Sequence, residues 1–210
     1  MKRSLVRPIC VLVVLLSLLI SPAASPAMAR PAAPLLVAAV PTGPQAGIIV
    51  DGVIDAAYGP PIASDSSGDG NGNPNMDLLD LYVAQDATNF YFAYTINADI
   101  GATHWGKYVM YDDTTNDANG ATSDAWTRNV VVNDPHKPEY GIYTWVDAAP
   151  YDPSDTQIVP WTGSAWDWGN VRQVAAGAIG AGTPSVIEWQ VAKADLGSPN
   201  TLWVEIWNTG

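Results

Sequence analysis

The sequence predicts an all-β domain, an antiparallel β-sandwich, preceded by a signal peptide. From residue 47 onward, short apolar runs alternate with turns rich in Gly, Asn, Asp and Pro, which is the pattern of a sandwich. Two of these runs, Leu79–Gln85 and Phe90–Ile96, alternate in polarity on either side of a four-residue loop, as the strands of a hairpin do. No stretch carries an apolar stripe with helical spacing.

The first 29 residues have the three parts of a secretory signal peptide. Three basic residues lie in the first seven positions, an apolar run occupies 9–20, and Ala27-Met28-Ala29 provides a cleavage signal. The apolar run is shorter than the roughly 20 residues that span a bilayer as a helix. A retained membrane anchor is the alternative. We expect a secreted or cell-surface protein without membrane attachment after cleavage, and a linker at 30–46, where Ala and Pro dominate.

The binding domain is expected at 47–210, with eight further strands besides the hairpin. These are Ile48–Val50, Lys107–Tyr111, Ala125–Val132, Gly141–Val146, Gln157–Trp161, Ala165–Trp168, Ser185–Val191 and Leu202–Trp207. Thr162-Gly163-Ser164 is predicted to form a tight turn, and Ala192–Leu196 is long enough for one helical turn. Because the chain ends directly after an apolar strand, we expect a fragment that is truncated at its C-terminal end.

The charge balance excludes two classes of partner. Four of the nine Lys and Arg lie at or before Arg30 and every Asp and Glu lies at or after Asp51, so the chain after Arg30 carries five basic and 21 acidic residues, a formal charge of −16. Such a surface repels nucleic acid and anionic lipid and suits cations or neutral ligands. The single cysteine, Cys10, lies in the predicted signal peptide. A small exported domain without disulfides needs another stabiliser, and we expect a bound metal.

Two loops place oxygen-bearing side chains at alternating positions, as a calcium ion with six to eight hard ligands requires. The candidate ligands are Asp65, Asp69, Asn71, Asn73 and Asp77 in the first loop and Asp113, Asp117 and Asn119 in the second. The first loop is predicted to bind calcium, and a solvated turn-rich loop is the alternative. For the second, a cation loop and a simple Asn-Gly turn after a strand both stay open.

Aromatic composition points to a ligand. Nine Trp and nine Tyr stand against two Phe, and the flat rings with polar edges of Trp and Tyr suit stacking on sugars. The predicted carbohydrate-binding residues are the tryptophans near loops and turns, namely Trp105, Trp126, Trp161, Trp166 and Trp168. Trp189, Trp203 and Trp207 lie inside apolar strands and are predicted to be in the core. For any single tryptophan, core packing is the alternative.

No catalytic centre is apparent. After the predicted signal peptide the chain has two histidines, His104 and His136, three glutamates and no cysteine, and it lacks the motifs of serine hydrolases and zinc proteases. A glycosidase needs two carboxyl groups flanking a cleft, and no pair of the many aspartates stands out. We predict that this chain is not itself an enzyme.

Four segments resemble family 9 carbohydrate-binding modules and their DOMON-like relatives. The segment Ile49–Asp55 resembles their I-x-D-G-x-x-D opening, and Ile187–Gly197 resembles their late E-W-x-I/V-x-K-x-x-L-G strand. The runs at 67–72 with 79–83 and at 89–92 are similar to the C-terminal domain of glucodextranase-type proteins. The resemblance spans residues 48–210.

The resemblance implies a jelly-roll-like antiparallel sandwich that binds carbohydrate without catalysis, with structural calcium at Asp65, Asp69 and Asn71. It implies a neutral polysaccharide such as an α-glucan as partner, and a tethered amylase- or glucodextranase-like hydrolase. One alternative is a haem-binding electron-transfer domain; we expect no haem, because its available ligands have no diagnostic spacing. Those ligands are Met76, His104, Lys107 and Met110. A structural cell-surface module that has calcium but no ligand is the other alternative.

Overall fold

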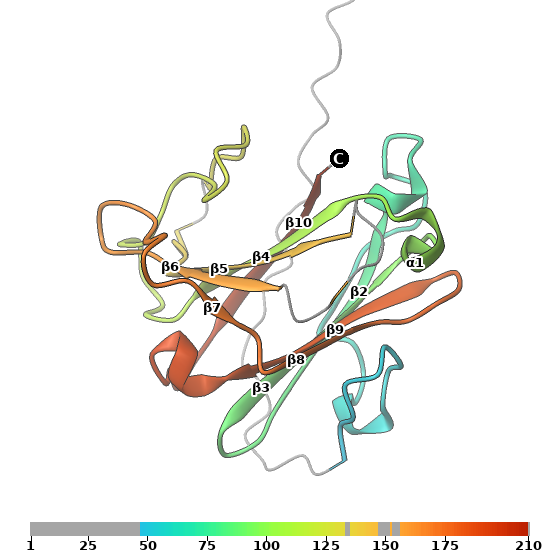
Figure 1. The fold of residues 1–210 in the computed structure, drawn as a ribbon, viewed down its shortest axis with the longest axis horizontal. Coiled ribbons are helices and arrows are strands. Elements are labelled where there is room, and N and C mark those ends of the chain that lie inside the picture. The colour runs from blue at the N-terminus through green and yellow to red at the C-terminus, as the bar shows by residue number, and fades with distance from the viewer. Residues whose placement is uncertain (1–46, 133–134, 147–151, 153–155, 210) are drawn as a thin grey trace, which may run out of the picture. The chain divides into compact units, whose positions relative to one another are not determined.

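The alternating segments of the sequence form two antiparallel sheets of five strands each (Figure 1). The computed structural model describes residues 47–132, 135–146, 152 and 156–209. Sheet A has the order β1 (Ala63–Ser64), β2 (Leu78–Gln85), β3 (Asn89–Ile96), β9 (Ser185–Ala192) and β8 (Ala176–Ile179). Sheet B has the order β10 (Trp203–Thr209), β4 (Lys107–Asp113), β5 (Tyr140–Trp145), β6 (Gln157–Pro160) and β7 (Arg172–Gln173). The predicted signal peptide and linker lie outside the described residues.

The apolar core lies between the two sheets, because each central strand turns one apolar face toward the other sheet. Its largest members are buried almost completely and come from both sheets: Leu81, Phe90, Phe92, Tyr94, Ile96 and Trp189 from sheet A, and Tyr108, Met110, Ile142, Ile158 and Val204 from sheet B. The predicted hairpin is β2 and β3, whose register pairs Val83 with Phe92. The all-β, two-sheet part of the prediction is therefore confirmed.

Three predicted strands are wrong. Ala125–Val132 does not join a sheet, because the Asp124 carboxylate holds the backbone amides of Trp126 and Arg128 at 2.9 Å. Such local side-chain bonds compete with a strand ladder. Ala165–Trp168 forms only one bridge, between Trp161 and Trp166, across the predicted turn. Ile48–Val50 also stays outside the sheets, with the amide of Ile49 bonded to Asp55 at 2.7 Å.

The helical segments among the described residues are short. They are η1 (Ala56–Tyr58), η2 (Pro74–Met76), α1 (Ile100–Thr103) and η4 (Lys193–Leu196). The last of these confirms the predicted helical turn near Leu196. Within the described part of the chain, no helix has the length and hydropathy that crossing a membrane requires.

The outer face of sheet A is covered by the first described residues. Glu188, which is buried on β9, accepts hydrogen bonds from the amides of Asp51 and Gly52, both at 3.0 Å, and from the Tyr58 hydroxyl at 2.9 Å. Gly52 has φ +82°, and a Cβ there would lie 2.4 Å from the backbone nitrogen of Gly180, so only glycine fits. The segment at 48–58 is therefore held on sheet A, and the outer face of sheet B is the one to examine for a ligand.

Candidate functional site

Aromatic side chains gather on the outer face of sheet B. The alternation of β4 and β5 turns Val109, Tyr111 and Tyr143 away from the sandwich core. The connections at 122–132 and 161–168 cross this face and add Trp126 and Trp166 to the same apolar cluster. A second, smaller apolar layer therefore lies outside sheet B.

Four of these rings form a continuous row, which we name the aromatic strip: Trp168, Trp126, Tyr143 and Trp145. Trp126 stacks on Tyr143 with ring centres 4.0 Å apart. Trp168 meets Trp126 edge-on at 5.2 Å, and Trp145 meets Tyr143 at 4.5 Å. The two ends of the strip reach solvent, because Trp168 is 48% and Trp145 40% exposed.

A partly buried ion pair between Arg128 and Asp124 holds the loop that supplies Trp126. The Nε of Arg128 donates to Asp124 at 3.0 Å, and the Tyr111 hydroxyl donates to the same carboxylate. Burial opposes ionisation of Asp124, but the hydrogen bonds from Arg128 and Tyr111 outweigh burial and lower its pKa. The guanidinium group lies 4.8 Å from the centre of the Tyr143 ring, where a cation and an aromatic face attract each other. The strip is therefore fixed on a rigid support.

The structure brings together four of the five tryptophans that the sequence predicts to bind carbohydrate. Trp166 contacts Trp161, with ring centres 5.5 Å apart, and its Nε1 donates to the carbonyl oxygen of Ser123 at 2.9 Å. Trp126 and Trp168 belong to the strip. Trp105 precedes β4, is half-buried, and is not a member of this row.

Sequence reasoning missed two members of the strip, Tyr143 and Trp145, and misplaced two other tryptophans. Trp145 alternates with Tyr143 on β5, and this spacing was the available signal. On β10, Val204 and Ile206 face the core, so Trp203 and Trp207 lie on the opposite face and the prediction that they are core residues is wrong. An apolar strand alone does not say which alternate set faces inward.

The first predicted calcium loop folds tightly around Asp77. One oxygen of this carboxylate accepts from the amide of Gly68 at 2.7 Å and from the Asn97 side chain at 2.8 Å. The other oxygen is buried and has no hydrogen-bond partner among the described residues. Partial desolvation, together with the charges of Asp65 and Asp77, raises the pKa of Asp69.

The other two candidates in this loop behave differently. The side-chain oxygen of Asn73 accepts from the amide of Asn75 at 3.1 Å and thereby caps η2, while Asn71 is exposed with φ +53°. Among the residues that the structure describes, no three His, Cys, Asp or Glu side chains form a preassembled metal site. The carboxylates of Asp65 and Asp77 raise the pKa of Asp69 through their charge, but the three side chains are not gathered into a metal site in this structure.

In the second predicted loop, the side chains are engaged in turns. One oxygen of Asp113 accepts from the amides of Thr115 and Asn116, and the other contacts His136 at 3.0 Å. Asp117 accepts from the amide of Asn119 at 2.7 Å. In these Asx turns each carboxylate accepts hydrogen bonds from backbone amides two or three residues further along the chain.

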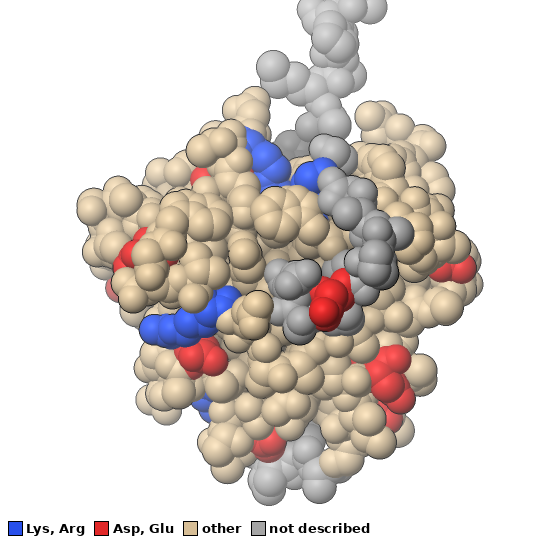
Figure 2. All heavy atoms as spheres, viewed as in Figure 1, with Lys and Arg blue, Asp and Glu red and all other residues tan. Residues whose placement is uncertain are grey.

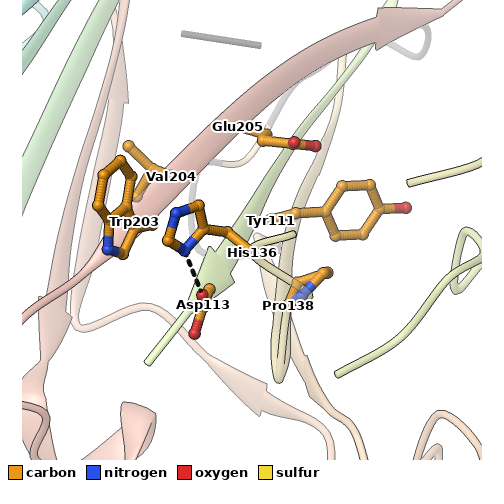
Figure 3. A pocket seen from close by; sticks show the side chains of 7 residues that line it. All are labelled: Tyr111, Asp113, His136, Pro138, Trp203, Val204 and Glu205. Carbon is orange, nitrogen blue, oxygen red and sulfur yellow. Dashed lines mark hydrogen bonds and ion pairs between the residues drawn. The ribbon is translucent and has the colours of Figure 1, made fainter. Parts of the chain in front are cut away.

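Asp113 and His136 belong to a small hollow that opens on the outer side of β10 (Figure 3). The His136 ring stacks on Trp203, with ring centres 3.8 Å apart, and points one nitrogen at Asp113. The hollow holds about 10 Å³, which is room for a single water molecule. An Asp–His pair in so small a space serves packing and loop closure better than it serves a substrate.

The haem alternative depends on residues in unlike surroundings. Met110 is fully buried in the sandwich core, whereas His104 is exposed at the C-cap of α1. Met76 and Lys107 are half-buried. An iron ligated by Met110 would have to enter the core between the sheets.

Charge is dispersed on the face of the domain shown in Figure 2. Acidic side chains form several small, separate groups there, and uncharged residues cover most of the area between them.

Comparisons with protein-family models, curated proteins and solved structures found no match. What the domain binds must therefore be argued from the geometry of its own residues.

Proposed function

We propose that this domain is a secreted, non-catalytic carbohydrate-binding module that holds a neutral polysaccharide, such as an α-glucan, against the aromatic strip. The observation that carries the proposal is the strip itself, in which two exposed tryptophans, Trp145 and Trp168, end a packed row of rings. A soluble domain rarely exposes large apolar rings in a row unless they serve an interaction. Sugar rings present apolar C–H faces, which stack on indole and phenol rings.

The surroundings of the strip favour a neutral polymer. The ion pair of Arg128 with Asp124 is internally satisfied, so it supports the rings without adding a free charge. The chain after Arg30 carries a large negative formal charge, which repels anionic polysaccharides. Because the supporting loop is already ordered by Asp124, binding needs little rearrangement of the protein, which preserves affinity.

Calcium in the loop at 65–77 is part of the same proposal. The unpaired buried oxygen of Asp77 fits a cation ligand, since a buried polar atom otherwise needs a hydrogen-bond partner. Asp65 and Asp69 would supply further hard oxygen ligands, and the ion would relieve the repulsion that raises the pKa of Asp69. The ion would order the loop.

The proposal also includes the finer fold assignment. In it, the domain is a DOMON-like, jelly-roll-like sandwich that is accessory to a tethered glycoside hydrolase.

The test is retention by immobilised polysaccharide. We expect Trp168→Ala and Trp145→Ala each to weaken migration retardation in native gels containing soluble starch about two- to tenfold, because a stacked ring contributes about 0.5–1.5 kcal/mol. Trp105→Ala is the matched control, since it removes a half-buried tryptophan outside the strip. Unchanged retention in both strip variants would reject the strip. A protein that calcium stabilises but that binds no glycan on an array would instead be a structural module.

A further inference from the structure

An open hollow lies at one end of the sandwich, where β4 ends and β5 begins. Its walls come from the residues after β4, the start of β5, the residue after β6 and the residues after η4. It has a volume of about 280 Å³, which is slightly below the roughly 300–1,000 Å³ of pockets for drug-sized ligands. The described residues that line it include none of the aromatic strip. The hollow is therefore a separate feature with room for a small molecule.

Glu139 brings a carboxylate in a fixed position to this hollow. Its Oε2 accepts from the amide of Thr114 at 2.7 Å and from the Thr114 hydroxyl at 3.0 Å, and its Oε1 accepts from the Thr115 hydroxyl at 3.2 Å. Both threonines also line the hollow. A carboxylate has about four acceptor positions, so these three hydrogen bonds leave one open. All three donors are uncharged, so they orient the carboxylate without neutralising it.

The described part of the chain supplies no cation to balance Glu139. No Lys, Arg or His is among the described residues that line the hollow. The charge of Arg172 acts on the neighbouring Tyr140, but the guanidinium group of Arg172 donates to the carbonyl oxygen of Asp195 at 2.6 Å and lies 3.8 Å from its carboxylate. Lys193 donates to the Asp86 carbonyl oxygen, also at 2.6 Å. A ligand can therefore bring the missing positive charge.

Two aromatic residues, Tyr140 and Trp161, line the same hollow. Trp161 is half-buried, and its Nε1 is buried without a hydrogen-bond partner among the described residues, so the accessible part of the indole is carbon. The Tyr140 hydroxyl lies beside Gly197, where a Cβ would approach it to 3.2 Å. Burial raises the pKa of Tyr140, so its hydroxyl stays neutral. The hollow therefore combines aromatic surface with one unbalanced carboxylate.

We propose that this hollow binds a small organic ammonium ion, for which Glu139 supplies the opposite charge and Trp161 and Tyr140 supply the aromatic surface. Aromatic rings attract cations, and quaternary ammonium groups are recognised in this way. A calcium ion fits less well, because it takes six to eight oxygen ligands and Glu139 is the one carboxylate among the described lining residues. A neutral ligand would leave the carboxylate unbalanced. The negative formal charge of the domain also draws cations toward it.

The experiment is a titration of the full chain with choline, followed by calorimetry at neutral pH. The matched control ligand is the neutral analogue of choline in which carbon replaces the quaternary nitrogen. We expect saturable binding of choline and much weaker binding of the analogue. Equal binding of the two ligands, or no saturable binding of choline, would overturn the proposal. Complete displacement of choline by an equal concentration of calcium would also overturn it, because the site would then prefer a metal ion.

Variants locate the site. Glu139→Gln keeps the size of the side chain and an acceptor for Thr114 but removes the charge, so we expect it to weaken choline binding about tenfold or more. Asp167→Asn, which removes the same charge from an exposed turn, should bind as the wild type does. Wild-type affinity in Glu139→Gln would overturn the proposal.

The aromatic contribution is tested at Trp161. Trp161→Leu should lose most of the affinity, whereas Trp161→Phe should keep part of it, because phenylalanine still presents an aromatic face. Equal affinity in folded Trp161→Leu and wild type would contradict the aromatic contribution, and Glu139→Gln decides if Trp161→Leu does not fold. The hollow and the aromatic strip share no described residue, so a failure of choline binding is distinguishable from a failure of starch binding.

Discussion

Replacing Glu188 with alanine should detach the segment at 48–58 from sheet A. The change leaves three donors without their acceptor, and two of them, the Gly52 amide and the Tyr58 hydroxyl, are buried. Each buried donor left unsatisfied costs about 1–3 kcal/mol, so we expect a loss of about 4 kcal/mol. The Asp51 amide is only partly buried and can bond to water instead. For a domain of this size the loss corresponds to a decrease of about 8–16 °C in melting temperature.

Glu188→Gln is the matched control. Burial raises the pKa of Glu188, so a neutral side chain of the same shape is tolerated, with the amide oxygen on the two backbone N–H groups and the amide nitrogen on Tyr58. We expect this variant to lose less than about 1 kcal/mol. Thermal unfolding measures both, and hydrogen exchange at Asp51 and Gly52 locates the effect. A loss below about 1 kcal/mol in Glu188→Ala would refute the reasoning.

Two further predictions concern single turns. Gly52→Ala should destabilise the domain by more than about 2 kcal/mol in chemical denaturation. The added Cβ would overlap the backbone of Gly180, and position 52 has a positive φ that alanine rarely adopts. A loss below about 0.5 kcal/mol would contradict the close approach of the two backbones. At Asp86, desolvation is outweighed by hydrogen bonds from the Thr88 and Asn89 amides and from the Tyr91 hydroxyl, so the folded-state pKa lies below the unfolded one. The stability that this carboxylate contributes is therefore complete above about pH 4 and is lost as the pH falls further. The difference between wild type and Asp86→Asn in urea unfolding should shrink below about pH 4, and a difference that is constant down to pH 2 would contradict this.

Sequence reasoning found the hairpin of β2 and β3 because two apolar runs flank a short polar loop, which predicts their pairing. Burial does not alternate along β3, which is buried on both faces from Phe90 to Ile96 because other residues also cover the outer face of sheet A. Ala125–Val132 has an equally apolar composition, but Asp124 captures its first amides and a residue with positive φ, Thr127, bends the chain. A carboxylate that caps a loop looks the same in sequence as one that follows a strand.

Part of the aromatic strip was also predictable from local sequence features. Proximity to turns correctly grouped Trp126 with Trp168, which meet only because two distant connections cross the same sheet. It missed Trp145, whose exposure depends on which face of β5 is covered. In the acidic run that starts at Asp112, sequence alone suggested one cation loop, whereas the strand alternation buries Asp112 and turns Asp113 outward. Neighbouring residues on a strand have opposite surroundings.

The indole N–H resonances of the nine tryptophans test the central claim most directly. In a titration of the full chain with soluble neutral polysaccharides, beginning with an α-glucan, proton–nitrogen spectra should show saturable shifts of Trp145, Trp168 and their neighbour Trp126. Trp105 and Trp189 should stay unchanged, because the first lies outside the strip and the second lies in the core. Shifts confined to other tryptophans, or no shift with any neutral polysaccharide, would contradict a carbohydrate-binding role for the aromatic strip.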